Sequence, residues 1–365
     1  MFSLAMVANI SSLPEELLLH IFEYLKLEDL EKIERSICYK SSHGRSRRFL
    51  NAVKSVKFSH IVITNYSRKQ VLDKKEVDAG ENISKFRLDR CFYVGVDDYK
   101  RLSGVLAEAQ LYDGPKKIYY IFGRNETGDS LHRVIRQFSK YLSMPPQKCQ
   151  KVVSELHLSL NPPHYIREVY EFRKDLEELI IIFLNFIINK LSLFEAVEGI
   201  YITNDLPSEI MSYESPFKGL FKIHSLQTLK IKNQFLNSVE SVHIPRSLKN
   251  YDLSFNKITN IHTPVRAANL QKLSLSHNSI TALPSDVLPQ GLVELDLSYN
   301  NLKTLNGKIF PSGLKKLNLS FNHIEKILFV IPPGLEILDL TGCEIKGIEQ
   351  SARERIQLQN IKVLL

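Results

Sequence analysis

The sequence LKNYDLSFNKI at Leu248–Ile258 recurs three times, as LQKLSLSHNSI, LVELDLSYNNL and LKKLNLSFNHI, which begin at Leu270, Leu292 and Leu314. The copies follow one another at a step of 22 residues. Each ends its apolar alternation with an asparagine, at Asn256, Asn278, Asn300 and Asn322. A fifth copy, Leu335–Ile345, keeps the leucines but has Cys343 in place of the asparagine. A phrase repeated in phase this often predicts stacked, similar turns rather than one globular core.

The alternating leucines of each copy predict a short strand that buries one face against its neighbours. The asparagine follows the strand, where its side chain can bond the backbone of the bend. The phrase resembles that of leucine-rich repeats. We therefore predict an α/β fold, a leucine-rich-repeat solenoid or horseshoe with a parallel sheet on its concave face. Copies of 22 residues leave too little chain for an outer helix, so we expect an extended or 3₁₀ outer wall.

A second informative stretch is LPEELLLHIFEYLKLEDLEKIERSICYK at residues 13–40. Pro14 followed by Glu15 and Glu16 predicts a helix start, because proline and acidic residues suit the first turn. Glu28 and Asp29 open a second predicted helix. A unit of this size has little core volume, so part of its apolar surface must meet the solenoid or another protein.

This stretch resembles an F-box, whose pattern runs Leu-Pro-x-Glu, then Ile-Phe-x-Tyr-Leu, then Asp-Leu. The matching residues are Leu13, Pro14, Glu16, Ile21, Phe22, Tyr24, Leu25, Asp29, Leu30, Ile37 and Cys38. The chain departs from the pattern after Cys38, where the family has a tryptophan and this chain has none. The resemblance implies a small all-α domain that docks on a Skp adaptor of a cullin–RING ubiquitin ligase. The docking residues it implies are Leu13, Pro14, Leu17, Leu18, Ile21, Phe22, Leu25 and Leu30. The alternative is a plain amphipathic cap over the open end of the solenoid.

These patterns predict an F-box at residues 10–52, irregular longer repeats at 53–225 and regular repeats at 226–365. Apolar spacing predicts further strands at Val53–Phe58, Ile83–Leu88, Tyr119–Phe122, Val153–Asn161, Leu176–Ile181, Val197–Ile202 and Leu226–Ile231. Helical spacing predicts helices at Tyr99–Ala109, Leu131–Leu142 and Ala352–Gln357. The last predicted strand is Ile361–Val363.

Composition describes an ordinary folded chain, with 44% hydrophobic and 24% charged residues. We interpret the net charge of +8 as a solvated surface rather than an affinity for nucleic acid. In Lys40–Lys57 every charge is basic, and we expect a helix with a solvated basic side. Four separated cysteines and no signal-peptide pattern predict a reduced protein of the cytoplasm, the nucleus or both. The longest apolar run is too polar for a membrane span, so we expect no membrane partner.

Signatures of nucleotide-binding, metalloprotease, hydrolase and kinase sites are missing from the sequence. The histidines are scattered and do not have metal-ligand spacing. We therefore expect no catalytic residue, no cofactor and no metal site.

The strand positions between the leucines predict two outward columns on the concave face. One column holds Lys230, Asp252, Ser274, Asp296, Asn318 and Asp339, and the other holds Thr228, Asn250, Lys272, Glu294, Lys316 and Ile337. On neighbouring parallel strands, Lys272, Glu294 and Lys316 can form a ladder of alternating charges. The residues before the asparagines form an aromatic stripe, either a protein-binding surface or the ordinary filling of the strand turn. The candidate substrate-binding residues are Asp252, Phe255, His277, Asp296, Tyr299, Phe321 and Asp339.

The F-box resemblance implies a non-catalytic substrate-recognition subunit of an SCF-type ubiquitin ligase. Its partners would be the Skp adaptor, through it the cullin and RING subunits, and a protein substrate held by the repeats. Two alternatives stay open: a leucine-rich-repeat scaffold working outside a ligase, and a GTPase activator of leucine-rich-repeat type. The sequence identifies no particular substrate.

Overall fold

The computed structural model describes the regular repeats almost completely and the preceding region in parts. The described residues are 13–38, 44–64, 92–95, 99–112, 115–123, 136, 153–161, 180–185, 187, 196–204, 220–234, 236–239, 244–262, 264–265 and 267–365. The chain divides into two compact units. Unit 1 comprises Met1–Glu168 and Lys190–Val197, and unit 2 comprises Val169–Asn189 and Glu198–Leu365.

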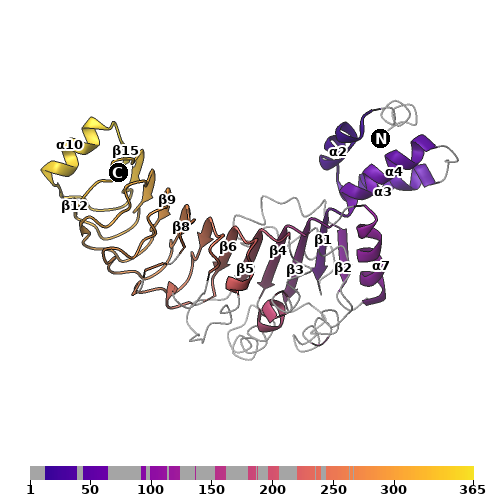
Figure 1. Ribbon diagram of the computed structural model, residues 1–365, viewed down its shortest axis with the longest axis horizontal. Coiled ribbons are helices and arrows are strands. Elements are labelled where there is room, and N and C mark those ends of the chain that lie inside the picture. Colours follow the sequence, from indigo (N-terminus) through magenta and orange to yellow (C-terminus); the bar gives the residue numbers. More distant parts are fainter. Residues whose placement is uncertain are drawn as a thin grey trace. The chain divides into compact units, whose positions relative to one another are not determined.

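The described part of unit 1 begins with three helices, α2 (Glu15–Glu23), α3 (Leu27–Cys38) and α4 (Gly44–Lys57) (Figure 1). Pro14 stands at the N-cap of α2, and Glu28 and Asp29 lie in the first turn of α3, as predicted. The apolar sides of the helices meet in one core, made of Leu18, Phe22, Leu30, Ile33, Phe49, Ala52 and Val53. The predicted all-α region is therefore a three-helix arrangement with its own buried centre.

The four strands described in unit 1 are parallel, in the order β2 (Phe92–Gly95), β1 (His60–Thr64), β3 (Lys117–Gly123) and β4 (Glu155–Asn161). Ile61, Val62 and Ile63 of β1 are all buried. Both faces of this strand are thus covered, which is typical of parallel sheets. Helix α7 (Tyr99–Gln110) follows β2 in the chain and confirms the helix predicted there.

Two strands predicted before the regular repeats are wrong where the structure describes them. Val53–Phe58 begins inside helix α4, because Val53 packs with Phe49 and Ala52 in the helical core. Residues 180–185 are helical, although a strand was predicted at Leu176–Ile181. The buried residues Ile180, Phe183, Leu184 and Ile187 have helical spacing, which decides the local structure.

Strand β2 was not predicted from the sequence. The strand predicted at Ile83–Leu88 lies outside the described residues. So does the helix predicted at Leu131–Leu142, except for Arg136, which is helical.

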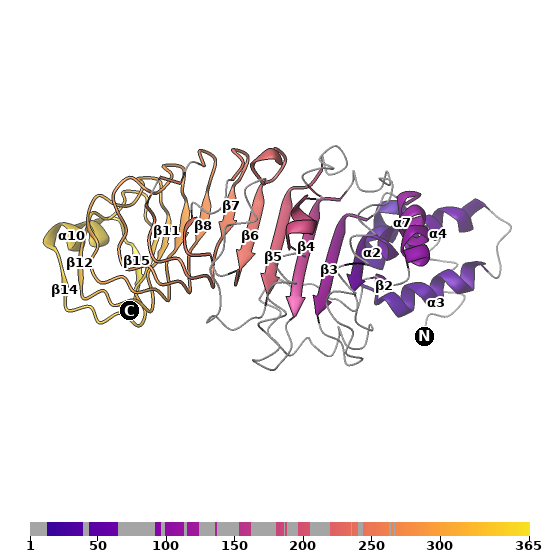
Figure 2. The same cartoon turned by 90° about the horizontal axis from the view of Figure 1, so that it is seen from below.

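The described strands of the main sheet of unit 2 are also parallel, and they lie side by side in chain order (Figure 2). They are β5 (Gly199–Asn204), β6 (Thr228–Lys232), β7 (Asn250–Asp252), β8 (Lys272–Ser274), β9 (Glu294–Asp296), β11 (Lys316–Asn318), β13 (Ile337–Asp339) and β15 (Lys362–Leu364). Residues at the same place in each phrase pair with one another, for example Asn250 with Lys272 and Lys272 with Glu294. The central residues of β7, β8, β9, β11 and β13 are buried, and the residues on either side of them in the strand are not. The predicted α/β repeat fold is confirmed.

A second ladder of short strands forms the outer side of the last repeats: β10 (Asn306–Gly307), β12 (Lys326–Phe329) and β14 (Gly347–Ile348). This confirms the expected extended outer wall. A proline precedes β7, β9, β11 and β13, and the leucine three residues later donates its N–H to the proline carbonyl, as from Leu292 to Pro289. Before β8 the same turn is made by Ala267 and Leu270. Helix α10 (Gln350–Leu358) follows β14 and comes before β15 in the chain.

Candidate functional site

The asparagines of the phrase hold the chain where each inner strand ends. Asn278 is buried, and its Oδ1 accepts the backbone N–H of Ile258 of the preceding repeat at 3.0 Å. Its Nδ2 donates to the carbonyls of Leu253, Leu275 and Ser276 at 3.1, 3.0 and 3.1 Å. Asn256, Asn300 and Asn322 make the corresponding bonds. Each amide therefore ties its own bend to the repeat before it.

The residue before each asparagine has a left-handed backbone conformation. Phe255, His277, Tyr299 and Phe321 have φ angles of 57°, 53°, 52° and 51°. This conformation is uncommon for bulky residues and costs about 1–3 kcal/mol. We infer that the asparagine bonds next to it hold the backbone there. Sequence reasoning placed these residues in one column but gave no sign of the unusual φ angles.

These four side chains form a continuous stack, which we call the aromatic column. The ring centroids of successive members lie 4.1, 4.1 and 4.3 Å apart, with planes within 9° to 14° of parallel. Phe255, Tyr299 and Phe321 remain 48%, 44% and 46% exposed. The stack thus covers the ring faces and leaves ring edges in solvent.

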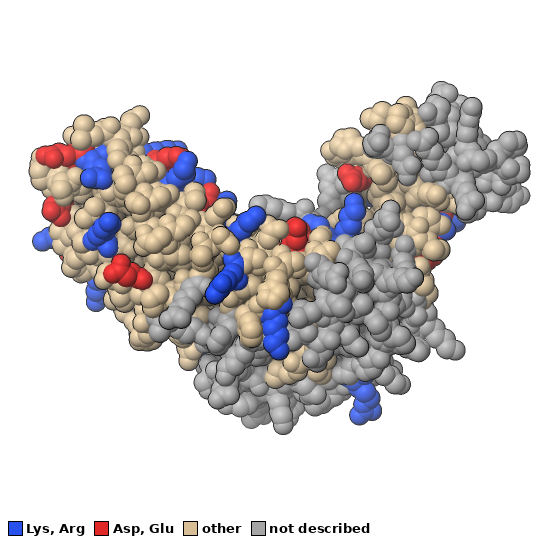
Figure 3. All heavy atoms as spheres, viewed as in Figure 1, with Lys and Arg blue, Asp and Glu red and all other residues tan. Residues whose placement is uncertain are grey.

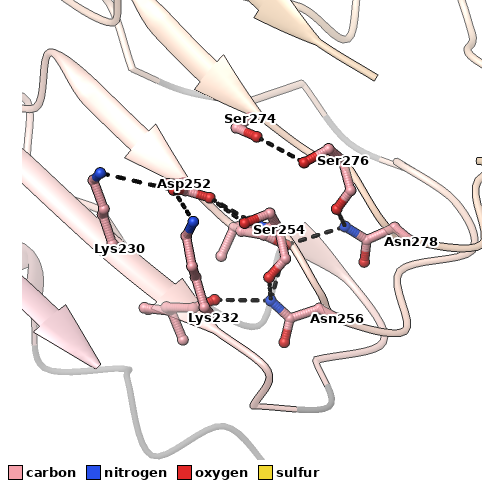
Figure 4. Close-up of polar contacts among 10 residues, drawn as sticks. Lys230, Lys232, Asp252, Ser254, Asn256, Ser274, Ser276 and Asn278 are labelled. Atoms are coloured by element: carbon pink, nitrogen blue, oxygen red, sulfur yellow. Dashed lines mark hydrogen bonds and ion pairs between the residues drawn. The ribbon is translucent and has the colours of Figure 1, made fainter. Parts of the chain in front are cut away.

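Polar side chains beside the column are held in fixed positions by their own repeat. Oδ1 of Asp252 accepts the backbone N–H and the hydroxyl of Ser254 at 3.0 and 2.7 Å (Figure 4). Asp296 bonds Ser298 in the same way. Asn318 makes the same two bonds to Ser320, which shows that an amide can replace the carboxylate in this arrangement. Asp339 accepts the N–H of Thr341 at 2.9 Å.

The predicted ladder of alternating charges is confirmed. Glu294 lies between Lys272 and Lys316, at 2.8 and 3.2 Å. The hydrogen bond from Lys272 and the second from Lys316 lower the pKa of Glu294 below its ordinary value. Lys230 and Lys232 converge on Asp252, at 4.0 and 3.1 Å (Figure 4). Such pairs contribute about 0.2–1 kcal/mol each at a solvated surface.

The two outward columns line a groove of about 630 Å³ on the inner face of unit 2. Its charged lining residues are Lys230, Asp252, Lys272, Glu294, Asp296, Lys316 and Asp339. On the face of the molecule seen in Figure 3, basic and acidic side chains of unit 2 are interspersed rather than gathered in one patch. The structure brings the predicted residues Asp252, Asp296 and Asp339 together in this groove.

Comparison with known proteins supports the reading of the repeats. The leucine rich repeat family model matches residues 268–324 and 290–345. These residues are leucine-rich repeats. A comparison with curated proteins gave no match.

Several solved structures are similar to this chain. The leucine-rich repeat domain of APL1B is 19% identical over 59% of this chain and 54% of that one, with a TM-score of 0.37. YopM from Yersinia enterocolitica is 20% identical over 56% and 46%, with a TM-score of 0.35. The functional domain of InlJ from Listeria monocytogenes is 16% identical over 69% and 44%, with a TM-score of 0.38. The chain spans about half the length of these structures. At such identities the likeness concerns the fold alone.

The structure divides the predicted adaptor residues of unit 1 into two groups. Leu18, Phe22 and Leu30 are at most 1% exposed and belong to the core of the three helices. The others reach the surface to different degrees: Leu17 is 49% exposed, Pro14 is exposed, and Leu13, Ile21 and Leu25 are partly buried. Tyr24, which matches the F-box pattern but was not among the predicted docking residues, is 64% exposed. Some of the apolar side chains predicted to contact the adaptor are therefore buried between the helices, and others remain at the surface.

The expectation of a freely solvated basic side on α4 is wrong for its last turn. Lys57 pairs with Glu34 of α3 at 2.7 Å, and Lys54 pairs with Glu108 of α7 at 2.8 Å. These two lysine side chains are only 12% and 16% exposed. They tie α4 to α3 and to the helix after β2. The sequence gave no signal for these contacts, because the partners are far apart along the chain.

His157 belongs to a group of polar and aromatic side chains on neighbouring strands. His157 is buried, and its Nε2 lies 3.1 Å from Glu155, which also pairs with Lys117 at 2.9 Å. These bonds outweigh burial and lower the pKa of Glu155 to about 2. The ring of Tyr119 stacks between His157 and His60, with centroid distances of 4.5 and 6.4 Å.

Metal-ligand clusters and membrane-spanning helices are absent from the described part of the chain. No group of three or more histidine, cysteine, aspartate or glutamate side chains there could hold a metal ion. Among the described helices, none combines the length and apolar character needed to cross a membrane.

Proposed function

We propose that this chain is a substrate receptor of an SCF-type ubiquitin ligase. Its three N-terminal helices would dock on a Skp adaptor, and its leucine-rich repeats would hold the protein to be ubiquitinated. The repeats support the broader role of an interaction scaffold. The adaptor, cullin and RING partners are the further proposal, and it derives from the F-box-like residues of α2 and α3.

One observation carries the adaptor proposal. Leu17 and Tyr24 stay 49% and 64% exposed, although the same helix has a formed core to pack against. Large apolar residues that are exposed together on one side of a helix often mark an interaction surface. They fall within the stretch that resembles an F-box.

The mechanism we propose is positional, and the chain contributes no catalytic group. The helices fix the receptor on the ligase, and the repeats keep the bound protein beside the enzyme that carries ubiquitin. Tethering of this kind raises the effective concentration of two reactants without new chemistry. Such a receptor would act in the cytoplasm, the nucleus or both.

Co-purification with a Skp adaptor tests the proposal. Leu17→Asp should abolish recovery of the adaptor, because a carboxylate would be placed within the apolar contact. Leu111→Asp is the matched control: this leucine of unit 1 is 76% exposed and lies outside α2 and α3. Recovery of the adaptor that is equal for wild type and both variants would exclude docking through α2.

The second candidate is a leucine-rich-repeat scaffold that works outside a ligase. It is favoured by the burial of Leu18, Phe22 and Leu30, since a plain helical cap would bury its apolar residues in the same way. Wild-type protein that fails to bind any Skp adaptor would favour this alternative.

A further inference from the structure

The groove of unit 2 has a charge balance that points to a kind of partner. Five of its seven charged lining residues belong to ion pairs within the described part of the chain: Lys230, Asp252, Lys272, Glu294 and Lys316. The remaining two, Asp296 and Asp339, belong to no ion pair there. Each lysine of the lining thus has a carboxylate partner, although Lys272 and Lys316 share Glu294, and the two charged groups outside these pairs are both carboxylates. The lining as a whole has three lysines and four carboxylates.

The two unmatched carboxylates lie on strands β9 and β13, on either side of Asn318 on β11. Parallel strands are about 4.8 Å apart, so a cation above Asn318 would be roughly one strand spacing from each carboxylate. In each carboxylate Oδ1 already accepts a backbone N–H, from Ser298 or Thr341. That bond fixes the orientation of the carboxylate and leaves its second oxygen for a ligand.

The aromatic column runs beside this pair of carboxylates. Burial lowers the pKa of the His277 imidazole, and the nearby charge of Asp296 offsets part of that shift. Tyr299 and Phe321, from the same repeats as Asp296 and Asn318, present half-exposed ring edges. A short peptide segment with a basic group between the carboxylates could therefore also reach these aromatic rings with its apolar side chains.

We propose that the groove and the aromatic column bind an extended segment of a partner protein that carries a basic side chain. The basic group would lie between Asp296 and Asp339, and neighbouring apolar side chains would pack on the edges of Tyr299 and Phe321. This inference rests on the proposed role of the repeats in holding a protein. It adds the chemical class of the segment that they recognise.

The natural sequence supplies a conservative way to remove the charge. Asn318 accepts the N–H and hydroxyl of Ser320 as Asp296 accepts those of Ser298, with the same distances of 3.0 and 2.7 Å. Asp296→Asn and Asp339→Asn should therefore keep the fold while they remove the unmatched charges. Asp286→Asn removes an equal charge from an exposed residue that does not line the groove.

The experiment is selection of random twelve-residue peptides, displayed on phage, against the purified full-length chain. Lysine and arginine should be enriched in the selected peptides, with apolar residues beside them. A selected peptide made synthetically should bind the Asp296→Asn, Asp339→Asn protein roughly fivefold or more weakly, as expected for the loss of charged contacts at a solvated surface. Its affinity for Asp286→Asn should be unchanged.

Three results would overturn the inference: no selected peptides, selected peptides without basic residues, or basic peptides whose affinity is unaffected by the double change. Circular dichroism of each variant checks that the fold is kept. The outcome is independent of adaptor binding, which depends on unit 1. A failed selection together with Leu17-dependent adaptor capture would leave the receptor role standing and reject only this class of partner.

Discussion

The buried asparagines should be the main polar contribution to the stability of the repeats, and Asn278→Ala tests this. The substitution removes the acceptor of the Ile258 N–H, and Ile258 is fully buried. An unsatisfied buried N–H costs about 1–3 kcal/mol, and lost bonds to carbonyls add about 1 kcal/mol net each where water does not replace them. With three such carbonyl bonds, partly compensated, we expect a loss of about 3 kcal/mol in the free energy of unfolding.

Asn301→Ala is the matched control, because Asn301 directly follows the repeat asparagine Asn300 but is exposed. Its effect should stay within about 0.5 kcal/mol, as for other surface substitutions. Urea unfolding followed by circular dichroism gives the free energies. Hydrogen exchange at β7, β8 and β9 shows whether the loss is local, as expected when each repeat contacts only its neighbours. Equal stability of the two variants would refute the idea that the amides hold the strand ends.

Two further predictions concern single residues. Gly342→Ala should destabilise unit 2 by about 1–2 kcal/mol in urea unfolding, because the residue has a φ of 73° and the added Cβ would lie 2.8 Å from the Phe321 ring. Gly104→Ala, in a helix with open space around it, should be neutral or stabilising, and equal effects would contradict the argument. Burial lowers the pKa of His60 to about 4 from 6.5, so the unfolded chain binds the proton first and stability falls as the pH drops from about 6.5 to about 4. Between pH 7 and pH 5 the loss should be about 2 kcal/mol in wild type and smaller in His60→Gln; an equal loss in both would exclude His60 as the cause.

The regular repeats could be predicted because one short phrase contains all the information that each needs. Leucine alternation sets the buried face, and the asparagine bonds only residues of its own repeat and the one before. The strands from Thr228 to Asp339 and the ladder around Glu294 followed from that local rule. The neighbouring positions of the aromatic column also followed from the repeat, but its left-handed backbone did not, because φ angles are not visible in an apolar pattern.

The longer repeats were harder to predict, because apolar residues three apart suit a helix as well as a strand. Val53 and Val56 had the spacing of a strand phrase, but contact with Phe49 made the segment helical. The contacts of Lys54 with Glu108 and of His60 with Tyr119 join residues far apart in the chain. Only the tertiary structure brings such residues together.

The most direct test of the central proposal is the affinity of the purified full-length chain for a purified Skp adaptor, measured by titration calorimetry. The account predicts saturable binding by wild type and Leu111→Asp, and no measurable binding by Leu17→Asp. Absence of binding by wild type, or equal affinity for all three proteins, would contradict it.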